Sequence, residues 1–267
     1  MLRKSPFGER VGVRGTEYIM LEVKNLLVFY ENALAINDLS LRVEKGQMVG
    51  VIGSNSAGKT TLMNTISGLI IDMKIKEERR GGERITVMGD VIFNGETITH
   101  MEPYDRAKKG IALCRERHPI FPESDVLENL KIAGYLVKRS ELKERIDFAF
   151  NLFPALVDLK RRRAGFLSGG EQQMLAIGMA LIIKPVLLLL DEPLLGLSPA
   201  IQSKLVQAVK NIQKEIGITT VISEQFARPI LPMIDYGYII ENGMLTLTGS
   251  GKELMDNPEV RSAYFGV

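Results

Sequence analysis

Short apolar runs separated by turn residues recur along this chain of 267 residues. Residues 21–30 alternate apolar and polar positions, and residues 40–43 continue this alternation up to a turn at Gly46, which predicts strands with one buried face. Residues 48–52 and 186–190 are apolar throughout. Short runs of this kind are typical of parallel strands that are covered on both faces.

Helical spacing lies between these runs. Residues 60–69 and 103–109 predict short helices, and apolar positions from residue 126 to about residue 159 predict a longer helical region. Further buried strands are expected at residues 111–114 and 219–222. Because strands alternate with helices, we expect an α/β fold with a mostly parallel sheet.

Two Asn-Gly pairs predict tight hairpins, since this dipeptide favours the type I′ turn. Asn94-Gly95 lies within residues 91–98, and Asn242-Gly243 lies within residues 238–247. Each pair is flanked by strand-like residues on both sides.

The chain is expected to form one domain at residues 20–267, preceded by an N-terminal arm at residues 1–19 that is charged and dotted with glycine. Within the domain, residues 72–84 are dense in charge and contain a Gly-Gly pair. We interpret this segment as a solvated, mobile insertion, and a hidden functional role is the alternative.

Composition excludes several classes of protein. The net charge is only +2, which gives no reason to expect nucleic acid or an anionic membrane as a partner. Cys114 is the single cysteine, so no internal disulfide is possible and a reducing cytoplasm is the natural setting. His100 and His118 lack metal-ligand spacing, which argues against structural zinc. The apolar stretch at residues 174–183 is about half the roughly 20 residues that span a bilayer, and no signal peptide is evident, so we expect a soluble protein.

The segment from Gly53 to Thr60 matches the phosphate-loop pattern G-x-x-x-x-G-K-[ST], between a strand-like run and a predicted helix. Glycines let the backbone N–H groups face a polyphosphate at a helix N-terminus, where the helix dipole also favours an anion. Lys59 adds positive charge against the β- and γ-phosphates of ATP, and the Thr60 hydroxyl is placed to bind Mg²⁺. The alternative is a glycine-rich turn without a ligand. The predicted nucleotide contacts are Gly53, Ser54, Asn55, Ser56, Ala57, Gly58, Lys59, Thr60 and Thr61.

The apolar run at residues 186–190 delivers two acids, Asp191 and Glu192, to the end of a predicted strand. In P-loop ATPases the first acid holds Mg²⁺, and the second can position and deprotonate the attacking water. The alternative is a strand that ends in an ordinary polar turn, but the accompanying phosphate loop favours the catalytic interpretation.

Residues 167–172 read Leu-Ser-Gly-Gly-Glu-Gln and lie between the phosphate loop and the acidic strand end. This string resembles the signature of ABC ATPases, and the resemblance extends along nearly the whole chain. Residues 168–183, 120–122, 187–199 and 223–225 look like the ATPase subunits of branched-chain amino-acid importers. Urea and short-amide importers share much of the same pattern.

This resemblance implies the P-loop NTPase ABC fold, with a mostly parallel core sheet, an antiparallel β subdomain and an α-helical lobe at about residues 120–165. It also implies a head-to-tail dimer with a second ABC ATPase subunit. Each nucleotide would lie between the phosphate loop of one subunit and the signature helix of the other, where the helix N-terminus can donate hydrogen bonds to the γ-phosphate. The implied signature contacts are Ser168, Gly169, Gly170 and Glu171.

Further partners are implied in the same way. They are two membrane permease subunits, one of which would place a short cytoplasmic helix against the helical lobe, and indirectly an extracytoplasmic solute-binding protein. The chain would then be cytoplasmic and bound to the inner face of the membrane through the permease. An ATPase of this type does not touch the transported solute.

Three positions depart from the common ABC pattern or leave an alternative open. Tyr30 stands where the family places an aromatic that stacks on adenine, and a core aromatic is the alternative. Glu116 stands where glutamine is usual; its carboxylate could bind Mg²⁺ or be a surface acid. Gln225 replaces the usual histidine, so it can donate a hydrogen bond to a γ-phosphate but carries no charge.

The favoured function is ATP hydrolysis that energises an importer, with Lys59, Glu192 and Gln225 as the catalytic residues. The alternative is a nucleotide-gated binding module, either a weakly hydrolysing partner in an asymmetric pair or a soluble ABC protein unrelated to transport. The presence of Lys59, Asp191 and Glu192 favours hydrolysis.

Overall fold

The computed structural model describes residues 18–82, 84–116 and 119–265. The predicted arm at residues 1–19 lies almost wholly outside these ranges, as does His118. Within the described part of the chain, no helix is both long enough and apolar enough to cross a membrane.

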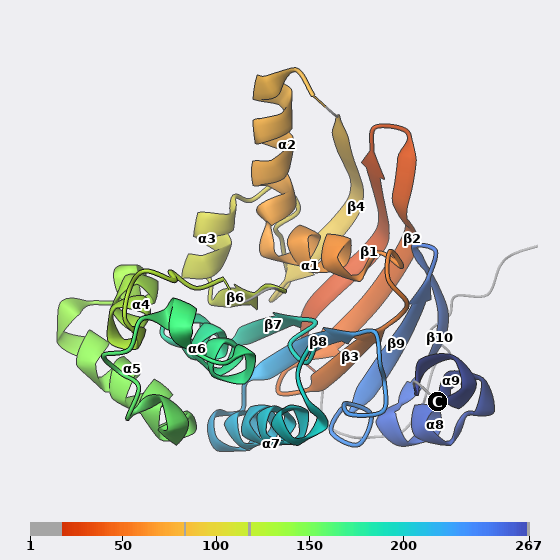
Figure 1. The fold of residues 1–267 in the computed structure, drawn as a ribbon. Helices are drawn as coiled ribbons and strands as arrows, with labels where there is room; N and C mark the ends of the chain where they lie inside the picture. The colour runs from red at the N-terminus through yellow and green to blue at the C-terminus, as the bar shows by residue number, and fades with distance from the viewer. Residues whose placement is uncertain (1–17, 83, 117–118, 266–267) are drawn as a thin grey trace, which may run out of the picture.

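A six-stranded sheet forms the centre of the molecule, with the strand order β10-β9-β3-β8-β7-β6 (Figure 1). All neighbours in it are parallel except β9 and β10. Its strands are β3 (Met48–Ile52), β6 (Ile111–Cys114), β7 (Leu187–Asp191), β8 (Thr219–Glu224), β9 (Tyr236–Glu241) and β10 (Met244–Ser250). The predicted mostly parallel core sheet is confirmed.

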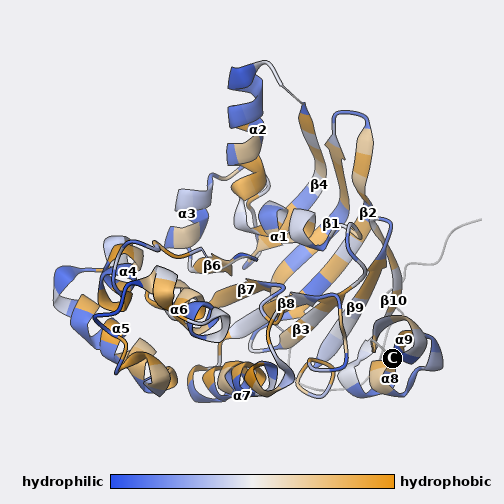
Figure 2. Cartoon of the chain, in the orientation of Figure 1, coloured by the Kyte–Doolittle hydropathy of each residue, from blue (hydrophilic) through white to orange (hydrophobic). Residues whose placement is uncertain are grey.

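Apolar side chains alternate between the two faces of this sheet. Val49 and Val51 of β3 pack into one buried cluster, whereas Met48 and Ile52 pack into the other. Figure 2 shows the resulting hydrophobic strands at the centre of the fold. Coverage on both faces explains why β3, and β7 up to Leu190, are apolar rather than alternating.

A second, antiparallel sheet has the strand order β2-β1-β4-β5. It contains β1 (Ile19–Tyr30), β2 (Ala33–Glu44), β4 (Ile85–Phe93) and β5 (Glu96–Thr97). Helix α1 (Lys59–Ser67) shares one apolar cluster with strands of both sheets, and it joins the two layers through Leu62, Met63 and Ile66. The predicted antiparallel subdomain is therefore present.

Both predicted hairpins form. Asn94 and Gly95 have φ values of 51° and 80°, and Asn242 and Gly243 have values of 50° and 76°. Two successive positive φ values are what a type I′ turn requires, and Asn-Gly adopts them at little steric cost.

Helices gather at one end of the parallel sheet, beside β6 and β7 (Figure 1). They are α4 (Val126–Ala133), η1 (Gly134–Leu136), α5 (Arg139–Leu152), η2 (Pro154–Leu156), η3 (Ala164–Phe166) and α6 (Gly169–Leu181). Helix α4 begins with a reciprocal capping box between Asp125 and Glu128. Helices α4, η1, α5 and η2 lie within residues 120–165, where the helical lobe was expected, whereas α6 lies beyond that range.

Several helices differ from expectation. The predicted helix at 60–69 ends earlier, because Gly68 takes a left-handed conformation with φ 87°. The charged segment at 72–84 is largely helical, since residues 72–80 belong to α2 (Leu69–Arg80), whose far end is polar in Figure 2. That the segment is an insertion stays a prediction. The remaining helices are α3 (Pro103–Lys108), α7 (Pro199–Ile216), α8 (Gly251–Asp256) and α9 (Pro258–Tyr264).

A fully buried arginine fixes the end of α1. The Arg106 guanidinium donates hydrogen bonds to the carbonyl oxygens of Thr65 and Ile66 at 2.6 and 2.9 Å, and to those of Thr99 and Met101 at 2.8 and 2.9 Å. Burial lowers the pKa of Arg106 to about 10, so the side chain remains charged at neutral pH. A cation at a helix C-terminus interacts favourably with the helix dipole, so Arg106 stabilises the far end of the helix that follows the phosphate loop.

Candidate nucleotide site

The phosphate loop joins β3 to α1 in a tight curve. Ser56 and Gly58 have φ values of 64° and 104°. A Cβ added at Gly53 would lie 2.4 Å from the carbonyl oxygen of Ile240, and one added at Gly58 would lie 2.7 Å from that of Ala35. Both contacts are with backbone atoms, which cannot swing away as a side chain would. The two glycines of the motif are therefore required by close packing of the chain.

Lys59 is held inside this loop. Its ammonium group donates to the carbonyl oxygens of Gly53 and Ser54, each at 2.9 Å, and lies 2.9 Å from Glu192 Oε1. Only 3% of the side chain is exposed. The three oxygens compensate the burial of the charge, and they fix the position of the ammonium group at the edge of the loop.

Glu192 follows β7 in a strained conformation, with φ 46°. Its backbone N–H group donates to both the carbonyl oxygen and the hydroxyl of Ser223, each at 3.1 Å. This anchor to β8 holds the turn, and the turn directs the Glu192 carboxylate toward Lys59. The structure therefore brings together the predicted base and the predicted phosphate-binding lysine.

Asp191 ends β7 and is almost completely buried. The Ser223 hydroxyl donates to Asp191 Oδ1 at 2.6 Å, and the Thr60 side chain is also hydrogen-bonded to this carboxylate. Burial raises the pKa of Asp191, and the nearby charges of Glu192 and Glu116 raise it further, while the two hydroxyl groups oppose the shift. The three predicted Mg²⁺ ligands, Thr60, Asp191 and Glu116, therefore act on one another at one edge of the sheet.

A cavity of about 580 Å³ opens beside the phosphate loop. Its lining is mostly polar, as a site for phosphate groups requires. The lining residues are Ala35, Asn55, Ser56, Gly58, Lys59, Thr60, Thr61, Glu116, Glu192 and Leu195. The sequence predicted eight of these ten. Ala35 and Leu195 were missed, because neither side chain carries a chemical group that marks it.

Apart from the signature residues, six predicted residues lie outside this lining: Tyr30, Gly53, Ser54, Ala57, Asp191 and Gln225. Tyr30 ends β1, is half-buried and packs against the apolar cluster beneath the antiparallel sheet. That placement fits a core aromatic, and stacking on adenine stays a prediction. Gln225 directly follows β8 and is half-buried. The preceding carbonyl of Glu224 accepts a hydrogen bond from Gly53 N–H at 3.2 Å, so Gln225 starts next to the phosphate loop.

Glu224 is a buried acid to which the sequence assigned no role. Its Oε1 accepts a hydrogen bond from the backbone N–H of Leu194 at 2.9 Å. Burial raises the pKa of Glu224 to about 8, and Glu192 and Asp191 push in the same direction, while Leu194 N–H and Lys59 oppose the shift. Glu224 thereby connects the end of β8 to the turn that carries Glu192. No pattern among the neighbouring residues predicts this contact.

The signature residues lie apart from the cavity. Ser168 caps α6 through a reciprocal box with Glu171: Ser168 N–H donates to Glu171 Oε2 at 2.7 Å, and Glu171 N–H donates to Ser168 Oγ at 3.4 Å. Ser168 and Gly169 are exposed, whereas Gly170 packs against Ile201. None of these residues lines the cavity at the phosphate loop. One chain therefore holds the two predicted halves of a nucleotide site without bringing them together.

Among the described residues, no group of three or more His, Cys, Asp or Glu side chains is arranged to hold a metal ion. Cys114 is buried in β6 and lies 3.7 Å from Gln173 Nε2. Burial raises the pKa of Cys114 to about 12, so the thiol is a poor nucleophile at neutral pH.

The fold and this cavity define a P-loop nucleotide-binding protein. A family model described as ABC transporter matches residues 36–195, which is more than half of the chain. The chain belongs to the ABC transporter family and is one of its ATP-binding subunits, which hydrolyse ATP.

Similar proteins cover nearly the same span. The chain is 36% identical over 247 residues to BraG of Pseudomonas aeruginosa, a high-affinity branched-chain amino acid transport ATP-binding protein, covering 92% of this chain and 100% of the relative. It is 33% identical over 249 residues to LivF of Archaeoglobus fulgidus, described as a probable protein of the same kind, covering 93% and 99%. A crystal structure of the ADP conformation of an ABC transporter cassette has a TM-score of 0.76 at 28% identity, covering 93% of this chain and 99% of the other.

Proposed function

We propose that this chain hydrolyses ATP to energise the import of branched-chain amino acids through a membrane permease. The observation that carries the proposal is the similarity to BraG, because it extends over 92% of this chain and the full length of the relative. LivF, which is named for the same kind of transport, is similar over a comparable span.

The nucleotide phosphates would occupy the 580 Å³ cavity at the phosphate loop. The backbone N–H groups of residues 54–61 and the Lys59 ammonium group would bind the β- and γ-phosphates. Thr60 and Asp191 would hold Mg²⁺ together with phosphate oxygens, and Glu116 would contribute a third oxygen ligand. These side chains offer only the hard oxygen atoms that Mg²⁺ prefers, so the residues fit the ion. When bound, Mg²⁺ neutralises negative charge on the phosphates.

The contact between Lys59 and Glu192 supports a mechanism in which the γ-phosphate of ATP releases Glu192 to act as the base. Both groups are buried and lie 2.9 Å apart. A γ-phosphate that approached the Lys59 ammonium group would compete with the Glu192 carboxylate for it. Glu192 would then be available to position and deprotonate the attacking water. Gln225, which follows β8 beside the loop, would donate a hydrogen bond to the γ-phosphate, and Tyr30 would stack on the adenine.

A second ABC ATPase subunit would complete each site. Ser168, Gly169, Gly170 and Glu171 begin α6, and the first two of these residues are exposed. In a head-to-tail dimer this helix N-terminus would meet the γ-phosphate bound to the phosphate loop of the partner. ATP would thereby hold the two subunits together, and hydrolysis would release them.

One of the two permease subunits would dock on the side of the helical lobe that faces α3. A cavity of about 300 Å³ lies there, lined mostly by apolar residues of α3, β6, η1 and α6. Tyr104 and Tyr135 stand nearby with ring centroids 6.4 Å apart, and they are 46% and 71% exposed. A short permease helix would fit this site. The solute-binding protein would act indirectly, from the other side of the membrane, and the ATPase would lie on the cytoplasmic face.

The proposal is tested by uptake of labelled leucine in cells that lack this gene and carry either the wild-type gene or the Lys59→Ala variant. Loss of uptake that only the wild type restores is the expected result. If uptake is unchanged in cells without a redundant importer, the proposed solute is wrong, and urea and short amides become the solutes to test. If Lys59→Ala restores uptake fully, the ATP-dependent role itself is wrong.

A further inference from the structure

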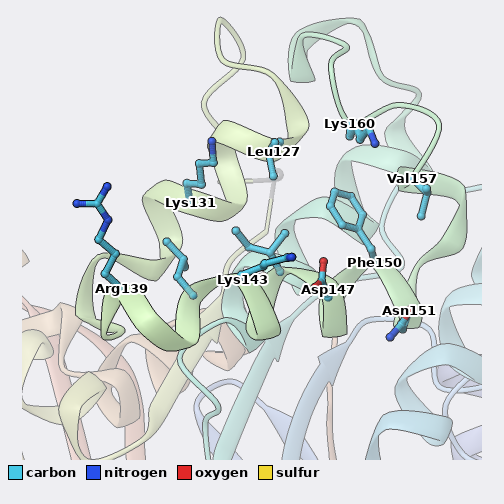
Figure 3. A pocket seen from close by; sticks show the side chains of 11 residues that line it. Leu127, Lys131, Arg139, Lys143, Asp147, Phe150, Asn151, Val157 and Lys160 are labelled. Atoms are coloured by element: carbon cyan, nitrogen blue, oxygen red, sulfur yellow. The ribbon is translucent and has the colours of Figure 1, made fainter.

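A groove lies on the helical lobe between α4 and α5, and it shares no lining residue with the proposed permease site or with the nucleotide cavity. Its volume is about 620 Å³. Figure 3 shows its walls, with α4 on one side and α5 on the other. The groove is lined by Leu127, Lys131, Arg139, Leu142, Lys143, Ile146, Asp147, Phe150, Asn151, Val157 and Lys160. We refer to it as the α4–α5 groove.

The floor of the α4–α5 groove is a linear apolar stripe. Leu142, Ile146 and Phe150 recur every four residues along α5, so they lie on one face of that helix. At a rise of 1.5 Å per residue the stripe is about 12 Å long, which matches roughly two turns of a second helix. Leu127 of α4 and Val157, which is 41% exposed, extend it on either side.

The rim of the groove is strongly basic. Lys131, Arg139, Lys143 and Lys160 border it, and Asp147 is the one acid in its lining. None of these four cations forms an ion pair with a residue that the structure describes. Some other cations of the lobe are paired: Arg145 with Glu141, Arg161 with Asp125, Arg163 with Glu123, and Lys184 with Glu144. Four cations and a single acid therefore surround the apolar stripe, which gives the rim of the groove a net positive charge.

The arrangement of these charges distinguishes between kinds of ligand. Arg139 and Lys143 come from α5, Lys131 from α4, and Lys160 from the segment after η2. In Figure 3 they are spread along the groove rather than gathered at one end. A ligand with a single anionic head group would satisfy one or two of them. A ligand with an apolar face and carboxylates along both flanks would satisfy them all.

We propose that the α4–α5 groove binds an acidic amphipathic helix of a partner protein. Apolar side chains on one face of the helix would pack between Leu127 and the Leu142–Ile146–Phe150 stripe. Acidic side chains on its flanks would reach Lys131 and Lys160 on one wall and Arg139 and Lys143 on the other. Such binding of a helix in a groove uses apolar anchors for affinity and flanking charge for orientation. A regulatory partner could thus bind the ATPase while the permease and nucleotide sites stay accessible.

The test uses a labelled synthetic peptide of about 15 residues, with leucine at helical i, i+4 and i+7 spacing and glutamate on both flanks. Binding is measured by fluorescence anisotropy with the full chain at low and high salt. We expect the Lys131→Glu/Lys143→Glu variant to bind about tenfold more weakly than wild type. The matched control, Lys204→Glu/Lys252→Glu, removes the same charge at exposed positions on α7 and α8 and should bind like the wild type.

A second variant tests the apolar floor without changing the charge of the groove. Val157→Asn places a neutral polar group at an exposed position of the groove, so folding should be little affected, and it should weaken binding of the acidic peptide. A peptide of the same pattern with lysine in place of glutamate should not bind. The proposal is overturned if the lysine peptide binds equally well or if the groove and control variants bind alike. It is also overturned if the groove variants reduce binding only to vesicles of anionic phospholipid, which would identify a membrane contact instead.

Discussion

The phosphate loop and the signature segment both present backbone donors at the start of a helix. They differ in how many contacts each makes with the rest of the chain. At the phosphate loop, Lys59 is 3% exposed and already contacts two carbonyl oxygens and Glu192. At the signature, Ser168 is exposed, and among the described residues its hydrogen bonds are to its own helix, through Glu171. The first region is built by contacts from distant parts of one chain. The second is built locally, and its exposed donors are suited to a ligand held by another subunit.

The largest effect is expected when the base beside the phosphate loop is removed. Glu192→Gln keeps the size of the side chain and an oxygen that can face Lys59, but an amide cannot accept a proton from water at neutral pH. We expect ATP turnover to fall by about a hundredfold or more while ATP binding is retained. Phosphate release measured beside an equilibrium ATP titration checks both parts. Undiminished turnover would show that another group acts as the base.

The next test compares Lys59→Ala with Ser168→Ala. Lys59→Ala should weaken ATP binding by the isolated subunit about 10- to 100-fold, because a charge-assisted contact to phosphate is lost. Ser168→Ala should leave that affinity within about twofold, since the loss of a helix cap costs only about 1 kcal/mol of stability. It should instead reduce ATP-dependent dimerisation, measured by light scattering in a Glu192→Gln background. If both variants weaken binding by the monomer equally, the proposed division between the two regions is wrong.

Paired glycine substitutions measure the packing of the two regions. In Gly53→Ala the new Cβ would lie 2.4 Å from the Ile240 carbonyl oxygen, so the backbone must move, and we expect a loss of about 2–3 kcal/mol in the free energy of unfolding. In Gly170→Ala it would lie 2.6 Å from Ile201 Cγ2, which is the end of a side chain. Ile201 can repack, and alanine favours the helix, so the net loss should stay below about 1 kcal/mol. Urea unfolding checks the difference; equal losses would mean that the loop yields as easily as the helix.

The same division explains how much of the molecule could be predicted from sequence. The phosphate loop is one continuous string whose glycines and lysine have specific chemistry, so six of the ten residues that line the cavity were identifiable from it. Glu192 was identifiable from the acidic end of an apolar strand, and Glu116 from the family resemblance. The capping box of Ser168 and Glu171 is equally local. The Asn-Gly hairpins and most strands follow from short-range patterns. The bounds of β2 and β4 were predicted poorly, since β2 begins at Ala33 rather than at residue 40 and β4 begins at Ile85 rather than at residue 91.

What was missed depends on contacts between distant segments. The role of Glu224 arises because β8 pairs with β3 and β7 and thereby brings its carboxyl against Leu194. Ala35 lines the cavity because β2 passes over Gly58, which its own sequence cannot reveal. The charge density of residues 72–80 concealed a helix, because α2 has few buried positions and its apolar periodicity is therefore weak.

The smallest effect is expected for Glu224, which lies beside the phosphate loop. Its pKa of about 8 in the folded chain exceeds its ordinary value of 4.5, so the fold retains a proton that the unfolded chain releases between these limits. Folding is therefore fully favoured by this group below about pH 4.5, and that contribution is lost as the pH rises through 8. Glu224→Gln cannot ionise and keeps the oxygen that accepts from Leu194 N–H. We expect it to raise the melting temperature by about 2–4 °C at pH 8 and by progressively less toward pH 5. Glu171→Gln, in the accessible capping box of the signature, is the matched control and should follow the wild-type pH profile; a constant difference between Glu224→Gln and wild type at every pH would show that ionisation of Glu224 does not affect stability.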